Sequence, residues 1–147
     1  MPVSLSKMPC EFLIDTDRRL VVSRGTGTFC LADFLGHMEK LRVDPRFRPE
    51  FDHLVDGRKF DRVDLSPTQI WELRGESVFA ATSRRAVIVS SRLHFGLARM
   101  FASYREAKSK QVTAVFWDLM EAVAWLGLPT DYDPSSLGEP TRIDGSD

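Results

Sequence analysis

Three histidines, His37, His53 and His94, are the side chains in this chain best suited to acid–base chemistry, because histidine is the side chain that titrates near neutral pH without help from its surroundings. None of the three has a recognisable catalytic partner in the sequence. A serine nucleophile is typically found in a sharp turn of the form Gly-x-Ser-x-Gly, and the chain has no such motif. The sequence therefore predicts that the protein is not an enzyme and names no catalytic residue.

Two other groups of residues could bind ions. Asp56, Asp61 and Asp64 follow a predicted strand, and carboxylates can hold a hard cation, but Lys and Arg residues alternate with them and favour a solvated, charged loop. The Gly25-Thr26-Gly27 segment lies between a predicted strand and a predicted helix, as phosphate-binding loops do, yet no Gly-Lys-Ser/Thr motif follows it. We therefore predict no metal and no cofactor.

Composition limits the class of protein further. The chain has 147 residues, of which 43% are hydrophobic and 28% charged, as expected for one globular domain. Its formal net charge of -1 gives no overall cationic field for non-specific binding of nucleic acid.

The two cysteines, Cys10 and Cys30, form neither a disulfide framework nor a metal-binding motif, and small apolar packing is the simpler interpretation of both. With no apolar segment long enough for a signal peptide or a membrane span, we expect a cytoplasmic protein.

Strands and helices are predicted to alternate along the chain. Two short apolar runs form a hairpin, and apolar residues spaced by three and four indicate helices. The predicted strands centre on 12–14, 20–22, 54–55, 86–89 and 112–117, and the predicted helices cover 31–41, 66–82, 92–108 and 118–127. The order ββαβαβαβα predicts an α/β fold, with a mixed β-sheet of about five strands covered by about four helices.

Two boundaries in this order are well marked. The Ser66-Pro67-Thr68-Gln69 segment matches a capping box with proline at the first helical position. Residues 129–147 are rich in Pro, Ser, Gly and carboxylates and have few large apolar side chains. We therefore expect a single domain over residues 1–128, followed by an acidic, mobile tail.

Several segments, taken in this order, resemble the bacterial SpoIIAA-like proteins, a STAS domain-like family largely without an assigned function. The similarity spans roughly residues 10–128 and involves no catalytic motif. It implies a mixed sheet with helices, in modules that bind other proteins or small ligands. The segments are Asp44-Pro45-Arg46-Phe47-Arg48-Pro49, His53-Leu54-Val55-Asp56, Ala86-Val87-Ile88-Val89, Phe95-Gly96-Leu97-Ala98-Arg99-Met100-Phe101, Val115-Phe116 and Ala122-Val123-Ala124-Trp125-Leu126-Gly127.

The resemblance also raises the question of phosphorylation. In anti-sigma-factor antagonists of the wider family, a serine in an Asp-Ser-Ser-Gly-like turn after the third strand is phosphorylated by a partner kinase. The matching turn here reads Asp56-Gly57-Arg58-Lys59 and lacks the serine. Ser66, at the next predicted helix start, is the remaining candidate acceptor, and an ordinary N-cap is the alternative interpretation of the same residue.

The predicted helix over 92–108 has two apolar faces. One face is expected to pack on the core and contains Leu93, Leu97, Met100, Phe101 and Tyr104. Phe95, Ala98 and Ala102 lie almost opposite, and Phe79 projects from the preceding helix in the same way. The predicted partner or ligand surface consists of Phe79, Phe95, Ala98, Arg99 and Ala102.

Charge is distributed unevenly around this helix. Residues 84–110 contain seven Lys or Arg and one acid, whereas residues 111–147 contain one Arg and seven acids. Screening of the basic helix by the acidic tail, or simple solvation, is favoured over nucleic-acid binding, because the segment lacks paired aromatic residues for base stacking.

The sequence thus favours a non-enzymatic binding or regulatory module. It would act through protein–protein association, most simply as a homodimer, or through a small apolar ligand between its helices. The alternative is a phosphorylation-switched regulator with Ser66 as acceptor. If the second apolar face mediates association, Phe95→Glu is expected to give a folded, more monomeric protein, whereas Phe101→Glu is expected to damage folding.

Overall fold

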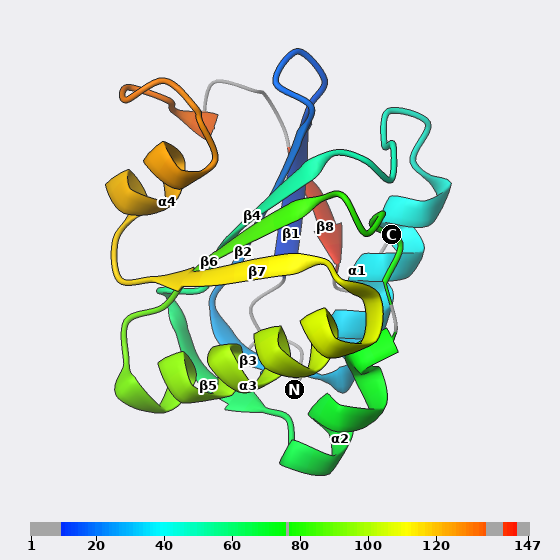
Figure 1. Cartoon of the computed structure of the whole chain (residues 1–147), viewed down its shortest axis with the longest axis vertical. Helices are drawn as coiled ribbons and strands as arrows, with labels where there is room; N and C mark the ends of the chain where they lie inside the picture. The colour runs from blue at the N-terminus through cyan, green and yellow to red at the C-terminus, as the bar shows by residue number, and fades with distance from the viewer. Residues whose placement is uncertain (1–9, 76, 135–139, 144–147) are drawn as a thin grey trace, which may run out of the picture.

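The computed structural model describes residues 10–75, 77–134 and 140–143, and these form a sheet with helices on both faces (Figure 1). The strands are β1 (Cys10–Asp15), β2 (Leu20–Gly25), β3 (Gly27–Cys30), β4 (Asp52–Asp56), β5 (Phe60–Asp64), β6 (Arg84–Ile88), β7 (Val112–Phe116) and β8 (Thr141–Ile143). The α-helices are α1 (Leu31–Val43), α2 (Pro67–Glu72), α3 (Arg92–Ser109) and α4 (Leu119–Trp125), and a short 3-10 helix, η2 (Leu73–Gly75), follows α2.

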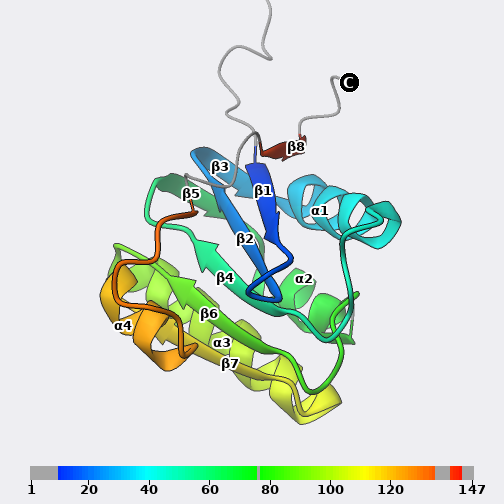
Figure 2. The same ribbon diagram turned by 90° about the horizontal axis from the view of Figure 1, so that it is seen from above.

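The main sheet has six strands in the order β7-β6-β4-β2-β1-β8. β1 and β2 form the predicted antiparallel hairpin, and β2, β4, β6 and β7 run parallel to one another. Each parallel step needs a crossover connection, and helices α2, α3 and α1 lie in these connections. Figure 2 shows the strands of the twisted sheet side by side. At one edge of the sheet, β8 lies beside β1.

Side chains of successive strand residues point to opposite faces of the sheet. Leu13, Leu54 and Ala86 belong to a packed cluster that includes Ala122 and Leu126 of α4. Phe12 and Val21 face the opposite way and pack with Leu41 of α1. The two faces are therefore different: α4 covers one, whereas α1, α2 and α3 lie over the other (Figures 1 and 2).

The predicted α/β class is confirmed. All five predicted strands are found in the main sheet, and all four predicted helices are present. The capping box at Ser66 is also confirmed: its hydroxyl accepts a hydrogen bond from the Gln69 backbone N–H, and the Gln69 side chain accepts one from the Ser66 backbone N–H.

A second, two-stranded sheet was not predicted. β3 and β5 pair in parallel, although the sequence analysis treated both segments as turns or loops. The Gly25-Thr26-Gly27 segment joins two strands here rather than a strand and a helix, so the phosphate-loop interpretation is wrong. Gly25 is required because a Cβ atom there would lie 2.6 Å from the Phe60 ring, and Gly27 has a positive φ of 75°.

Two further boundaries differ from the prediction. The predicted helix over 66–82 is much shorter, because α2 ends at Glu72 and η2 ends at Gly75. In the C-terminal tail, where no strand was expected, Thr141–Ile143 pair with β1 as β8. Much of the predicted tail, 135–139 and 144–147, lies outside the described residues, so its mobility stays a prediction. Within the described part of the chain, no helix has the length and apolar composition of a membrane span.

The predicted face assignment of α3 is correct only in part. Leu97 and Phe101 face the interior as predicted, but Leu93, expected to face the core, is 70% exposed, and Ala102, expected on the outer face, is buried. His94 and Arg105 are also buried. The inward side of α3 therefore combines apolar residues with two ionisable ones, and the ionisable residues do not appear as part of an apolar stripe in the sequence.

Candidate functional site

A cavity of about 200 Å³ lies between the main sheet and the helices that cover its α1–α3 face. Aromatic and aliphatic side chains form most of its wall, and they come from the main sheet, the small β3-β5 sheet and helices α1, α2 and α3. Named by position, the wall includes Phe29, Phe34, Val55, Phe60, Ile70, Phe79, Val87, Leu97 and Phe101. A cavity of about 150 Å³ with apolar walls is large enough to take benzene, so this cavity has room for a small organic molecule.

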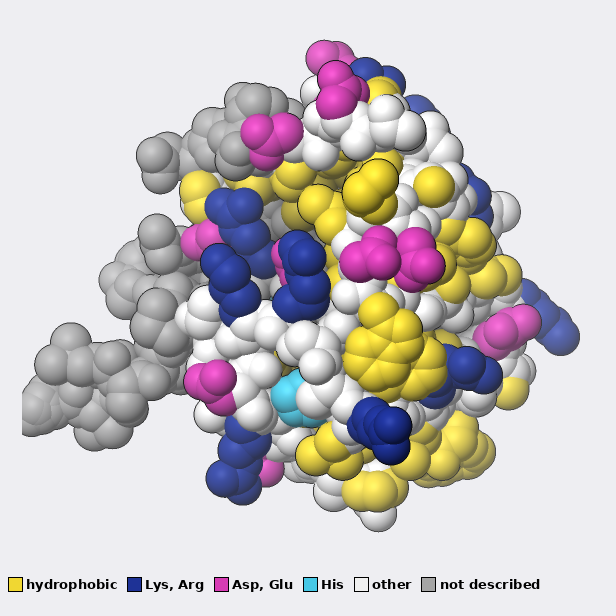
Figure 3. Space-filling model, turned by 90° about the vertical axis from the view of Figure 1, so that its left-hand side faces the viewer, with side chains coloured by type: hydrophobic (Ala, Val, Ile, Leu, Met, Phe, Trp, Pro, Cys, Tyr) yellow, Lys and Arg dark blue, Asp and Glu magenta, His cyan; other side chains and the backbone are white. Residues whose placement is uncertain are grey.

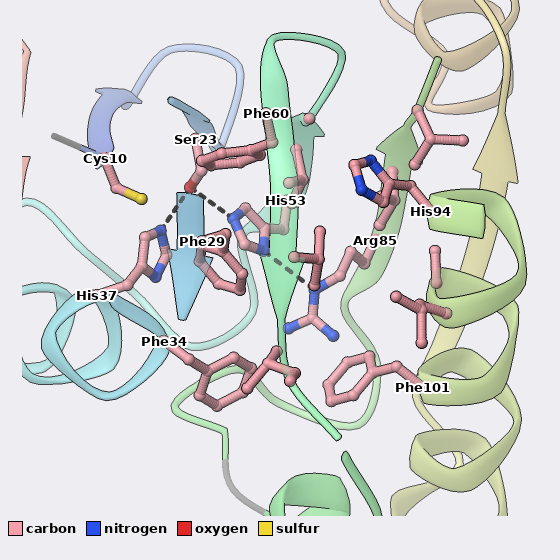
Figure 4. A pocket seen from close by; sticks show the side chains of 18 of the residues that line it. Cys10, Ser23, Phe29, Phe34, His37, His53, Phe60, Arg85, His94 and Phe101 are labelled. Atoms are coloured by element: carbon pink, nitrogen blue, oxygen red, sulfur yellow. Dashed lines mark hydrogen bonds between the residues drawn. The ribbon is translucent and has the colours of Figure 1, made fainter. Parts of the chain in front are cut away.

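A chain of hydrogen bonds between polar side chains runs along one side of this cavity (Figure 4). The Ser23 hydroxyl on β2 lies 2.5 Å from Nε2 of His37 on α1 and 2.8 Å from Nε2 of His53 on β4. Nε of Arg85 on β6 donates to Nδ1 of His53 at 3.1 Å. Adjacent strands place these residues together, because β2 pairs with β4 and β4 pairs with β6.

The hydrogen-bond donors and acceptors in this side-chain network can be assigned starting from Arg85. A guanidinium can only donate, so Nδ1 of His53 is an acceptor and the proton of neutral His53 is on Nε2. That N–H donates to the Ser23 oxygen, and the proton of the Ser23 hydroxyl is then available to donate to Nε2 of His37. Hydrogen-bond direction thus fixes the tautomer of His53.

Both rings are held in the neutral form. Burial, reinforced by the positive charge of Arg85, lowers the pKa of His37 from 6.5 to about 3. Burial also lowers the pKa of His53 well below its ordinary value, and the positive charge of Arg85 acts in the same direction, as does His37 once it is protonated. Neither histidine is protonated near neutral pH, so the cation of this network is Arg85.

The Ser23–His37 pair has the contact of a nucleophile with a general base, but its surroundings oppose that chemistry. A general base works best when its pKa lies near the operating pH, and the pKa of His37 is far lower. An orienting carboxylate would stabilise an imidazolium in a catalytic triad, whereas His37 lies in the field of the Arg85 guanidinium. The network is built to keep its histidines uncharged.

Arg85 is buried with only part of its hydrogen-bonding capacity used. Its side chain is 8% exposed, and its Nη1 atom has no hydrogen-bond partner among the described residues. The rings of Phe79 and Phe101 lie near the guanidinium, at 5.4 Å and 5.7 Å, and provide partial stabilisation by cation–π contact. Figure 4 shows the guanidinium directed into the space near Phe34 and Phe101.

The electrostatic character of the cavity is positive. Arg24 and Arg85 are among its lining residues, and within residues 10–75, 77–134 and 140–143 no Asp or Glu lines it. Arg24 pairs with Glu11 at 2.6 Å, whereas the charged group that acts on Arg85 is another cation, Arg105. Burial and Arg105 lower the pKa of Arg85 from 12.5 to about 9, so its guanidinium is still charged at neutral pH.

The carboxylates of Asp56, Asp61 and Asp64 do not form a cluster. Asp56 makes a two-bond pair with Arg58, at 2.9 Å and 2.8 Å, and Asp61 and Asp64 are exposed. Within residues 10–75, 77–134 and 140–143, no three His, Cys, Asp or Glu side chains come together as metal ligands would. Asp61 and Asp64 are charged and solvated as expected, but they belong to strand β5 and not to a loop.

The predicted surface residues separate into two groups. Phe79 and Ala98 line the cavity, so the structure places both where a ligand could contact them. Phe79 is buried and does not project outward as predicted, and Ala102 is also buried, so neither forms an external docking surface. Phe95 stacks on Trp117, with centroids 4.7 Å apart, and Arg99 lies over the Phe95 ring.

Ser66 is the exposed N-cap of α2, and phosphorylation there stays a prediction.

Sequence reasoning missed Ser23 and Arg85 altogether and left His37 and His53 without partners. The signal that could have found them is a polar residue in an apolar strand. Ser23 ends the run of Leu20, Val21 and Val22, and Arg85 comes directly before the apolar run at 86–89. A buried polar group needs a partner, so polar residues on neighbouring strands are candidates for one network.

No protein-family model matches the chain, and no curated protein matches it either. Among solved structures it is similar to an uncharacterized protein of the DUF3478 family with a SpoIIAA-like fold, from Shewanella loihica PV-4. The two share 19% sequence identity over 86% of this chain and 98% of that chain, with a TM-score of 0.52. The chain therefore has the SpoIIAA-like fold, and the predicted resemblance is confirmed for the fold.

Proposed function

We propose that this SpoIIAA-like domain is a non-enzymatic binding module that holds a small, largely apolar molecule in the cavity under α3. The observation that carries the proposal is the cavity itself. Apolar side chains from both sheets and three helices converge on about 200 Å³ that the side chains of the described residues leave unfilled, although protein interiors are normally close-packed. Unfilled apolar space is costly to maintain, and binding sites are where such space has a use.

The absence of a working base supports a binding role over a catalytic one. Ser23 contacts His37 at the cavity wall, and the pKa of His37 is about 3 because the ring is buried beside Arg85. A fixed, neutral network suits recognition of a ligand better than proton transfer.

Filling the cavity with a side chain tests this function. Ala98 lines the cavity from α3, so Ala98→Phe would place a ring where the ligand is proposed to bind. Ala107, exposed on the same helix, gives the matched control Ala107→Phe. With 1-octanol as the probe, we expect calorimetry to detect binding to the native protein and to Ala107→Phe, and to show at least about a tenfold loss for Ala98→Phe, because its ring occupies the same volume. No binding to the native protein would contradict the proposal.

We also propose self-association as a second role, carried by a different observation. Phe95 and Trp117 stack on each other with their rings 7° from parallel, and Trp117 is 48% exposed. Leu93 and Met120, which lie close to these residues in the sequence, are 70% and 72% exposed. Figure 3 looks onto the face that carries α4 and the start of α3, where hydrophobic side chains gather among charged ones. Exposed aromatic residues of this kind are typical of interfaces.

A further inference from the structure

Arg85 gives the cavity a chemical preference. A buried guanidinium without a counter-ion is costly, and burial of an ion is tolerated when a charge of opposite sign pairs with it. Among the described residues, Nη1 of Arg85 has no hydrogen-bond partner, and no Asp or Glu of the same set lines the cavity. No described carboxylate therefore neutralises this cation.

The position of Arg85 also matters. Its Nε atom is tied to Nδ1 of His53, and the His53 ring stacks on Phe79 at 4.6 Å, so one side of the guanidinium is fixed in orientation. The other side is directed toward the cavity (Figure 4). Fixing the donor group before a ligand arrives reduces the entropy lost on binding.

We infer that the cavity binds a small monocarboxylate, with the carboxylate group paired to the guanidinium of Arg85 and the hydrocarbon part among the aromatic side chains. This inference rests on the proposed binding function and specifies its ligand class. Guanidinium–carboxylate bonds are among the strongest hydrogen bonds in proteins. A carboxylate also suits the neutral tautomers of His37 and His53, because Arg85 is then the one charge in the network that needs compensation.

The ligand's size follows from the same geometry. The cavity, at about 200 Å³, exceeds the roughly 150 Å³ that suffices for benzene. It is nevertheless smaller than the roughly 300–1,000 Å³ of ordinary ligand pockets. An acid with one ring or a medium-length chain therefore fits better than a nucleotide or a complete lipid.

A pair of probes that differ only in the polar group tests the inference. We expect octanoate to bind the native protein about tenfold or more tightly than 1-octanol at neutral pH, because the alcohol has no charge for Arg85 to pair with. In Arg85→Met, which keeps most of the side chain's length without its charge, octanoate should bind no better than 1-octanol. Arg92→Met, at an exposed position on α3, should keep the preference of the native protein.

The outcomes separate the two proposals. If both probes bind the native protein with equal affinity, the cavity is a binding site and the inference about Arg85 is wrong. If neither probe binds, the binding function is wrong and the inference is overturned with it. Octanamide, which has the shape of octanoate without its charge, makes the same comparison on the unaltered protein. Equal affinity for octanoate and octanamide overturns the inference even if Arg85→Met does not fold.

Discussion

At the scale of single residues, Arg85 determines the state of the network beside the cavity. It fixes the tautomer of His53 by donating to Nδ1, and its charge helps to keep His37 neutral. The direction of the hydrogen bond from His53 to Ser23 then follows, because a neutral imidazole that accepts at Nδ1 carries its proton on Nε2. Substitution of Arg85 would therefore change the protonation of residues that it does not touch.

His37 gives a pH-dependent stability that can be measured. In the unfolded chain His37 takes up a proton below its ordinary pKa of 6.5, whereas in the folded chain it does so near pH 3. The free energy of unfolding should therefore fall as the pH drops through this interval, by about 2 kcal/mol between about pH 7.5 and about pH 5. His53 acts in the same direction, because its pKa is also lowered by burial.

Urea denaturation of the native protein and of His37→Gln at the two pH values checks this expectation. The variant lacks the titrating group, so its loss of unfolding free energy should be smaller by about 2 kcal/mol. An equal loss in both proteins would show that His37 does not titrate as its burial implies.

At the scale of secondary structure, α3 shows what sequence patterns can and cannot reveal. Its boundaries were predicted nearly correctly, because Ser91 is a cap whose hydroxyl accepts from the His94 backbone N–H and local capping is visible in sequence. Its inward face was predicted only in part, because Arg105 is buried by pairing with Gln111 and with the Arg74 carbonyl. Such partners are brought together by tertiary structure, and no local pattern encodes them.

The face of α3 can be tested directly with two substitutions to the same residue. Leu93→Glu alters an exposed side chain and should change the free energy of unfolding by no more than about 0.5 kcal/mol. Ala102→Glu places a carboxylate at a buried position and should cost about 3 kcal/mol or more, because the charge has no solvent there. Chemical denaturation of both variants provides the comparison. A larger cost for Leu93→Glu would restore the face predicted from apolar periodicity.

The small β3-β5 sheet is a second case at this scale. The sequence of β3 suggests a turn because Gly25 and Gly27 lie at its start. The sequence of β5 suggests a loop because it contains several charged residues. Tertiary packing explains Gly25, because the Phe60 ring of β5 occupies the space where a side chain at this position would lie. Phe29 and Phe60 pack at 5.3 Å and both line the cavity, so the unpredicted sheet supplies part of the site.

At the scale of the whole molecule, the two faces of the main sheet differ. The face covered by α4 is closely packed, whereas the face covered by α1, α2 and α3 contains the cavity. Successive residues of β4 show the difference, because Leu54 is fully buried in the α4 cluster and Val55 lines the cavity. The order of elements along the chain was enough to predict the α/β class. The cavity could not be predicted, because its existence depends on how α1, α2 and α3 are spaced above the sheet.

Self-association belongs to the same scale, because it concerns the outer face near α4 and the start of α3. The residues expected to mediate it are Phe95 and its stacked neighbour Trp117. In a two-fold dimer the patch of one copy faces the same patch of the other, so a substitution there acts twice. Val43, at the end of α1, is 62% exposed, and helix α1 lies on the opposite side of the molecule from α4 in Figure 1. Val43 is therefore a suitable site for a control.

Phe95→Glu should therefore weaken dimer formation by about a hundredfold or more, because each copy loses apolar burial and gains a charge at the interface. Val43→Glu should leave association unchanged, since it adds the same charge to a different face. Light scattering over a range of concentrations distinguishes the variants, and circular dichroism establishes that both are folded. A native protein that stays monomeric at high concentration would refute association through this face. It would leave ligand binding unaffected, because neither Phe95 nor Trp117 lines the cavity.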